Sequence, residues 1–147
     1  MFSRIVVAVD DSPDSTRVVE FVKHMATGSD LTLILAHAWH VPPEVAGLAG
    51  QLSADGSYVN RVRARLIAAS DALLARCQAA IGGAAIHVET ASVEGKPGPA
   101  LVEVARVHQA EAVAIGRRGR GRVKSLLLGS VSDYVVHHAA CPVIVVP

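Results

Sequence analysis

Segments typical of β-strands and segments typical of α-helices alternate along this chain from one end to the other. The predicted strands are apolar runs at residues 4–9, 31–39, 84–93, 112–116 and 142–146, and helical stretches separate them. This alternation favours a parallel sheet with helices on both faces, because each right-handed crossover returns the chain to the same end of the sheet. A chain of 147 residues has the common length of one domain, so we expect a single domain over residues 1–147.

Local signals place the helices between these strands. Ser12 has the side chain of an N-cap and Pro13 suits a first helical position, so a helix is expected from there to Gly28. Residues 57–81 keep helical apolar spacing throughout. The stripe consists of Val59, Val62, Leu66, Leu73, Cys77 and Ile81. Prolines and glycines between residues 42 and 56 predict a long loop.

Composition limits the classes of function. Hydrophobic residues make up 51% of the chain and aromatic residues only 3%, which suits a buried parallel sheet built from small aliphatic side chains. A net charge of +1 argues against a nucleic-acid partner held by bulk charge. Cys77 and Cys141 have neither disulfide-framework nor zinc-ligand spacing, which favours a cytoplasmic location. No apolar run has the length of a membrane span, and the N-terminus lacks the features of a signal peptide.

The loop after the fourth predicted strand carries the strongest functional signal. Gly116 and Gly119 would let backbone N–H groups approach an anion closely, and Gly129 with Ser130 places a helix N-terminus beside them. Together they predict a phosphate cradle. The alternative is structural: Ser130 and Asp133 have the spacing of a capping box, and the glycines can simply turn the chain.

The spacing Gly116-x2-Gly119-x9-Gly129-Ser130 resembles the ATP-binding signature G-x2-G-x9-G-[S/T] of universal stress proteins. Further matching segments are VDDS at 9–12, the second strand with His37, EGKP at 94–97 and CPVIVV at 141–146. The resemblance therefore covers the whole chain. It implies a five-stranded parallel sheet in the order 3-2-1-4-5, with helices on both faces in a Rossmann-like α/β fold.

The resemblance also implies a set of nucleotide-binding residues. Asp10 would lie at the ribose or adenine side, Ala8 and Ala38 would line the base pocket, and the glycine segments would hold the ribose and phosphates. The set is Ala8, Asp10, Ala38, Gly116, Arg117, Arg118, Gly119, Gly129, Ser130, Val131 and Ser132.

Acidic and basic residues near these positions have two interpretations. Asp10 and Asp11 could merely stabilise the start of the following helix; we favour the ligand role for Asp10 and the helix role for Asp11, where the family usually has glycine. Arg117, Arg118 and Arg120 could reach triphosphate oxygens. For Arg122 and Lys124 a solvated loop is the better interpretation.

The histidines show no metal-ligand or catalytic pattern. His37 lies in a predicted strand and is interpreted as a packed side chain, while His137 and His138 favour the negative end of the last helix. We therefore predict no catalytic residue and no metal site within the protein.

The first functional hypothesis is a regulatory ATP-binding protein, with Mg²⁺ accompanying ATP, whose nucleotide occupancy changes its conformation or its binding of a regulatory protein partner. The alternatives are a slow ATPase or self-phosphorylating protein, for which Ser130 or Ser132 would supply the hydroxyl, and a nucleotide-free interaction module. A homodimer through the last strand is expected, because an apolar edge strand is usually covered. No partnership with nucleic acid or a membrane is expected.

Overall fold

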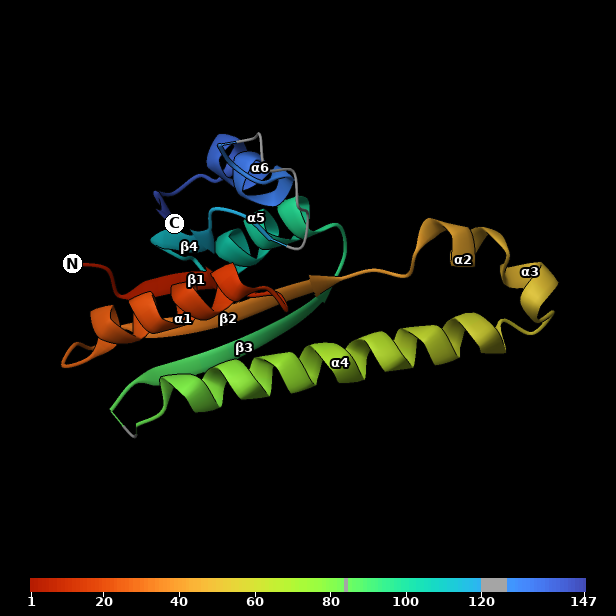
Figure 1. Cartoon of the computed structure of the whole chain (residues 1–147), viewed down its shortest axis with the longest axis horizontal. Helices are drawn as coiled ribbons and strands as arrows, with labels where there is room; N and C mark the ends of the chain where they lie inside the picture. The colour runs from red at the N-terminus through yellow and green to blue at the C-terminus, as the bar shows by residue number, and fades with distance from the viewer. Residues whose placement is uncertain (84, 120–126) are drawn as a thin grey trace.

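The computed structural model describes residues 1–83, 85–119 and 127–147. Within these residues, five parallel strands form one sheet in the order β3-β2-β1-β4-β5, and helices cover both of its faces (Figure 1). The predicted fold class and strand order are confirmed. The elements are β1 (Arg4–Ala8), α1 (Pro13–Ala26), β2 (Thr32–Trp39), α2 (Pro43–Gly47), α3 (Ala49–Leu52), α4 (Ser57–Ile81), β3 (His87–Glu94), α5 (Pro97–Val107), β4 (Ala112–Gly116), α6 (Ser130–His138) and β5 (Val143–Val146).

The central strand β1 separates two hydrophobic cores, because successive side chains of a strand point to opposite faces of the sheet. Ile5 and Val7 belong to the core that α1 and α4 cover. Val6 and Ala8 belong to the core that α5 and α6 cover. All four are buried, which explains why this strand reads as an uninterrupted apolar run.

Helix α1 begins as its sequence predicts. Pro13 is its first residue, and the hydroxyl of the N-cap Ser12 accepts the backbone N–H of Ser15 at 3.3 Å. Val18 and Val22 are fully buried against the sheet. The apolar stripe of α1 therefore packs the helix against the sheet. The N-terminus of α1 lies directly after the carboxyl end of β1.

Helix α4 has the predicted bounds, but the sheet covers only part of it. Leu73 and Ile81 are buried, whereas Val59, Val62 and Leu66 are half-buried. Figure 1 shows the first part of α4 extending beyond the sheet together with α2 and α3. An apolar stripe predicts which face turns inward, but not how far the covering elements reach.

The segment predicted as a long loop contains the two short helices α2 and α3, so that prediction is wrong in part. Pro43 occupies the first turn of α2, where its missing N–H costs no hydrogen bond and its fixed φ favours the helix. The same proline that indicates a loop can thus start a helix. Another difference concerns β3, which begins at His87; residue 84, where the strand was predicted to start, lies outside the described residues.

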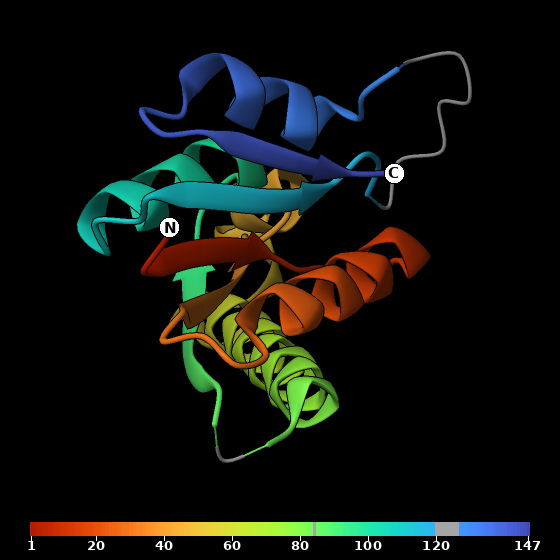
Figure 2. The same ribbon diagram turned by 90° about the vertical axis from the view of Figure 1, so that its left-hand side faces the viewer.

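The strand order places the carboxyl ends of β1 and β4 side by side. Ile5 pairs with Ala112 and Val7 pairs with Ala114 in parallel register. From β1 the sheet continues through β2 to β3 on one side and through β4 to β5 on the other. The direction of winding therefore reverses between β1 and β4. Strand β5 then forms an edge of the sheet (Figure 2). In the described ranges, no helix has both the length and the apolar character needed to cross a bilayer.

Candidate functional site

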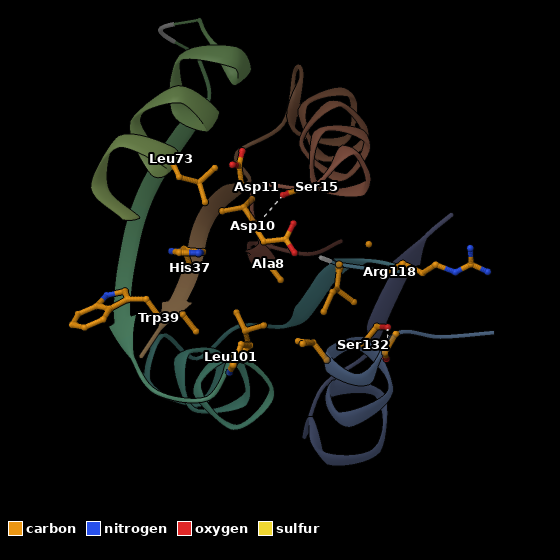
Figure 3. A pocket seen from close by; sticks show the side chains of 18 of the residues that line it. Ala8, Asp10, Asp11, Ser15, His37, Trp39, Leu73, Leu101, Arg118 and Ser132 are labelled. Atoms are coloured by element: carbon orange, nitrogen blue, oxygen red, sulfur yellow. Dashed lines mark hydrogen bonds between the residues drawn. The ribbon is translucent and has the colours of Figure 1, made fainter. Parts of the chain in front are cut away.

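A pocket of about 550 Å³ opens at the carboxyl ends of β1, β2 and β4 (Figure 3). This is the point where the winding of the sheet reverses, and open parallel sheets bind ligands at such points. Helices α4 and α5 contribute its apolar side, and the start of α6 contributes its other end. A volume of this size can accommodate a small organic ligand.

The structure brings all but one of the predicted site residues to this pocket. Arg117 is the exception: its side chain is exposed, and the residue is not among those lining the pocket. The residues at the pocket are Ala8, Asp10, Ala38, Gly116, Arg118, Gly119, Gly129, Ser130, Val131 and Ser132. Their roles toward a ligand stay predictions.

Asp10 serves the helix start and also faces the glycine loop. Its Oδ1 accepts the backbone N–H of Ser12 at 3.1 Å and also the hydroxyl of Ser12. Its own N–H donates to the hydroxyl of Ser15 at 2.9 Å. Its Oδ2 is turned toward Gly119. The two interpretations of Asp10 therefore concern different oxygens of one carboxylate.

A side chain at any of the three glycines would be crowded, by a movable carboxylate at Gly119 and by tighter packing at Gly116 and Gly129. A Cβ atom at Gly119 would lie 2.7 Å from Oδ2 of Asp10, and one at Gly116 would lie 3.0 Å from Cβ of Asp14. At Gly129 a Cβ atom would lie 3.3 Å from the backbone Cα of Arg118. These approaches keep the segment after β4 packed against the ends of β1 and α1, with backbone rather than side chains at the pocket wall.

Asp14 is a site residue that sequence reasoning missed. Its Oδ2 accepts the backbone N–H of Arg118 at 3.0 Å, and its Oδ1 pairs with Arg17. The sequence suggested only a favourable charge at the positive end of α1. No local signal links Asp14 to a loop about a hundred residues later, because the contact exists only once β1 and β4 are neighbours.

The start of α6 differs from its capping-box prediction. The N-cap is Gly129, without a side-chain cap, and Ser130 is the first helical residue, so the interpretation of Ser130 as the cap is wrong. Instead, the Ser132 hydroxyl donates to the backbone carbonyls of Arg117 and Gly129, at 2.9 and 3.0 Å. The N–H of Gly129 also donates to the Arg117 carbonyl at 2.8 Å. Ser132 therefore fastens the start of α6 to the end of β4.

The start of α6 lies at the polar end of the pocket. The first N–H groups of any α-helix have no acceptor within that helix, and the helix dipole adds positive potential there. Ser130 and Val131, in the first turn of α6, line the pocket beside Gly119. Arg118 is half-buried and lines the pocket, but Figure 3 shows its side chain pointing away from the other labelled residues. Arg120, Arg122 and Lys124 lie outside the described residues.

The opposite end of the pocket is mainly apolar. Leu66, Leu73 and Leu101 line it together with Trp39. His37, predicted as a packed histidine, is half-buried in this wall, and its Nδ1 is 2.8 Å from the hydroxyl of Ser70 in α4. The pocket thus has a polar end at the glycine loop and a mainly apolar end between α4 and α5.

Two further charged residues line the pocket. Arg76 in α4 pairs with Asp11 at 3.4 Å, and both residues line the pocket. Their side chains are largely exposed, which makes this a weak surface ion pair. Asp11, for which the sequence favoured a role at the start of α1, therefore also pairs with a residue of α4.

The two cysteines are free thiols. Burial is the main cause that raises the pKa of both Cys77 and Cys141, so each stays protonated at neutral pH. Thiolate chemistry is thus disfavoured at both. In the part of the chain that the structure describes, no group of three or more histidine, cysteine or acidic side chains is arranged to hold a metal ion.

Comparison with known proteins identifies similar chains. A model of the universal stress protein family matches residues 1–147. The universal stress protein in the QAH/OAS sulfhydrylase 3′ region of Thermus aquaticus is 28% identical over 146 residues, covering 99% of each chain.

Solved structures with the same fold include two that hold nucleotides. A universal stress protein in complex with cAMP is 28% identical, with a TM-score of 0.66 over 99% of this chain and 96% of that one. The universal stress protein from Archaeoglobus fulgidus in complex with dAMP is 22% identical, with a TM-score of 0.62 over 99% and 98% of the two chains.

Proposed function

The chain belongs to the universal stress protein family, and we propose that it is a regulatory stress-response protein that binds ATP in the pocket at the ends of β1, β2 and β4. Nucleotide occupancy changes its conformation or its binding of a protein partner. The observation that carries this proposal is the meeting of Asp10, Gly119 and the start of α6 at one end of a mainly apolar pocket.

The two ends of the pocket suit the two ends of a nucleotide. Triphosphate oxygens would accept hydrogen bonds from backbone N–H groups at Gly119 and in the first turn of α6, where the helix dipole favours negative charge. The carboxylate of Asp10 would accept a ribose hydroxyl. The base would lie between Ala8 and Ala38, toward the apolar wall. The adenine nucleotides bound by two proteins of this fold support the choice of base.

Mg²⁺ would arrive with the triphosphate. Mg²⁺ prefers oxygen ligands and in nucleotide sites usually keeps several waters while phosphates supply the rest. Asp10 and Asp11 are carboxylates at the pocket, which suits such an ion, although Oδ1 of Asp10 already accepts two hydrogen bonds from Ser12. We therefore propose that phosphates and water bind Mg²⁺ directly, and that the protein acts on the ion only through them.

Slow ATP hydrolysis or self-phosphorylation is the second candidate. In self-phosphorylation a serine hydroxyl would take the γ-phosphate and ADP would leave, and one observation chooses between the two serines. Ser132 is 2% exposed and its hydroxyl donates to two backbone carbonyls, which opposes attack on a phosphate. Ser130 is exposed and lines the pocket, so it would be the acceptor. Loss of phosphate incorporation from radiolabelled ATP in Ser130→Ala, but not in Ser132→Ala, would establish this role.

The proposal also includes a homodimer through β5 and a cytoplasmic location. Strand β5 is at the edge of the sheet, and Val143, Ile144 and Val145 are only half-buried, so a second copy would cover apolar surface and satisfy edge backbone groups. A regulatory protein partner would then recognise the nucleotide-loaded dimer.

The decisive experiment uses the protein as purified from cells. Denaturation followed by mass spectrometry of the supernatant should release an adenine nucleotide, and calorimetric titration of the emptied protein with Mg-ATP should show saturable heat. A nucleotide-free module would release nothing and show no heat with Mg-ATP. That pair of results would overturn the proposed function.

A further inference from the structure

Helices α5 and α6 approach each other closely at one point near the pocket. Gly98, in the first turn of α5, is buried, and a Cβ atom added to it would lie 2.8 Å from both Cγ and Cδ1 of Tyr134 in α6. It would also lie 3.0 Å from Cβ of Tyr134. Carbon atoms in favourable contact are about 3.5–4.0 Å apart. The absence of a side chain at Gly98 is therefore what lets Tyr134 pack against α5.

The ring of Tyr134 has little freedom to move aside. Its Cβ atom is fixed by the backbone of α6, so no change of rotamer removes that part of the contact with Gly98. The imidazole of His138, one turn further along α6, stacks on the ring with 3.9 Å between the centroids and 13° between the planes. A side chain at position 98 would therefore push one of the two helices away from the other.

Of these two helices, α6 is the less firmly held. Five residues of α5 are buried, whereas α6 buries only Ser132 and Val135, so α6 yields first. Helix α5 packs on β1, β2 and β3, while α6 lies against the edge strand β5. Figure 3 shows the two helices side by side, α5 with Leu101 and α6 with Ser132. The contact between Gly98 and Tyr134 thus places α6 relative to a well-anchored neighbour.

Both helices line the pocket, but at different ends. Helix α5 contributes Pro97 and Leu101, of which Leu101 belongs to the apolar wall, and α6 contributes Ser130 and Val131 beside the glycine loop. Tyr134 itself is not among the residues that line the pocket. Any effect of Tyr134 on a bound ligand is therefore indirect and acts through the position of the first turn of α6.

We propose that Tyr134 is a positioning residue of the nucleotide site: by packing on Gly98 it sets the distance between the start of α6 and the apolar end of the pocket. It controls how well a phosphate meets the first turn of α6, and not how well base and ribose bind. This inference rests on the nucleotide function proposed above. It adds a residue outside the pocket that favours phosphorylated over unphosphorylated adenosine.

The position of α6 is measured first, on the protein without nucleotide. Crystal structures of the parental protein and of Gly98→Ala should show the start of α6 displaced from α5 by roughly 0.5–1 Å, the distance needed to restore ordinary carbon contacts. The sheet and α5 should superimpose. A structure in which α6 keeps its place and the Tyr134 ring alone has moved would overturn the proposal.

Recognition is measured as the ratio of the Kd values of adenosine and ATP, by competition with a fluorescent ATP analogue. In Gly98→Ala, ATP should bind about threefold to thirtyfold more weakly, as expected when phosphate loses its favourable place at a helix start. Adenosine affinity should change less than about twofold. Tyr134→Phe keeps the ring and should preserve the parental ratio. Gly47→Ala is the matched control in α2, where nothing lies within 4 Å of the added Cβ atom.

A double variant separates this role from a folding defect. Tyr134→Ala removes the ring, so α6 loses its fixed position and the ratio should fall. With Gly98→Ala added, the new methyl group occupies part of the space that the ring has left. The double variant should therefore lie nearer the parental ratio than the two single effects multiplied together, because residues in contact are not independent. Effects that simply multiply would overturn the proposal.

The outcomes distinguish the two proposals. If the parental protein does not bind ATP, the proposed function fails and the role of Tyr134 fails with it. If ATP binds but Gly98→Ala keeps the parental ratio, or weakens adenosine as much as ATP, only the role of Tyr134 is overturned. The same holds if Tyr134→Phe loses the ratio, since packing of the ring is then not what matters.

Discussion

The carboxylate of Asp10 lies so close to Gly119 that a Cβ atom added to this glycine would be 2.7 Å from Oδ2. Asp10 follows β1 and Gly119 follows β4, and the pairing of these two strands brings them together. A carboxylate and an exposed backbone segment thus share one end of the pocket.

Replacing Asp10 by alanine should weaken ATP binding by a factor between about five and a hundred, because a carboxylate that accepts a ligand hydroxyl is lost. The Ser12 N–H also loses its acceptor, so the free energy of unfolding should fall by about 1 kcal/mol. Calorimetric titration and denaturant unfolding measure the two effects separately.

Ser12→Ala is the matched control for Asp10. It removes the N-cap hydroxyl and its hydrogen bond to Asp10 while leaving the carboxylate in place, so stability should fall by about 0.5–2 kcal/mol with little change in ATP affinity. If Asp10→Ala binds ATP as the parental protein does, Asp10 acts only at the helix start.

Gly119→Glu should abolish ATP binding. The new side chain would occupy the space in front of the loop backbone, displace the Asp10 carboxylate and repel phosphate. The flexible end of Asp10 can move aside, so we expect the denaturant midpoint to stay near the parental value. Gly50→Glu adds the same charge in open space on α3 and should bind ATP normally. Parental affinity in Gly119→Glu would remove the glycine motif from the site.

Asp14→Ala should lower ATP affinity by about tenfold without any change in a pocket-lining residue. The Arg118 N–H loses its acceptor in this variant, so the start of the glycine loop is no longer held against α1. Arg17→Ala removes only the partly exposed ion pair of Asp14 and should leave binding unchanged. Equal affinity in both variants would show that the loop keeps its position without Asp14.

Val143→Asp or Val145→Asp should shift a dimer toward monomer, because each places a charge on the apolar edge strand β5. Sedimentation velocity over a range of protein concentrations measures the change, with circular dichroism to verify folding. Val107→Asp changes an exposed valine at the end of α5 and should remain dimeric. A parental protein that stays monomeric at high micromolar concentration contradicts the dimer itself.

Elements set by local chemistry could be predicted from the sequence. The helix 57–81 and the strand 112–116 have the predicted bounds, because apolar periodicity and flanking glycines act over short distances along the chain. The spacing of Gly116, Gly119 and Gly129 likewise located the loop that lines the pocket. By contrast, Pro43 misled the prediction, since proline suits both a loop and a first helical turn.

The sequence by itself thus determined the order of the elements, the buried faces of β1 and α1, and the segments that meet at the pocket. Only the tertiary structure decided which atoms contact one another there: Oδ2 of Asp14 with the Arg118 N–H, and the Ser70 hydroxyl with Nδ1 of His37. These contacts join residues that are distant in the chain. Their partners become defined only when parallel strands pair in register, and local propensity carries no information about that pairing.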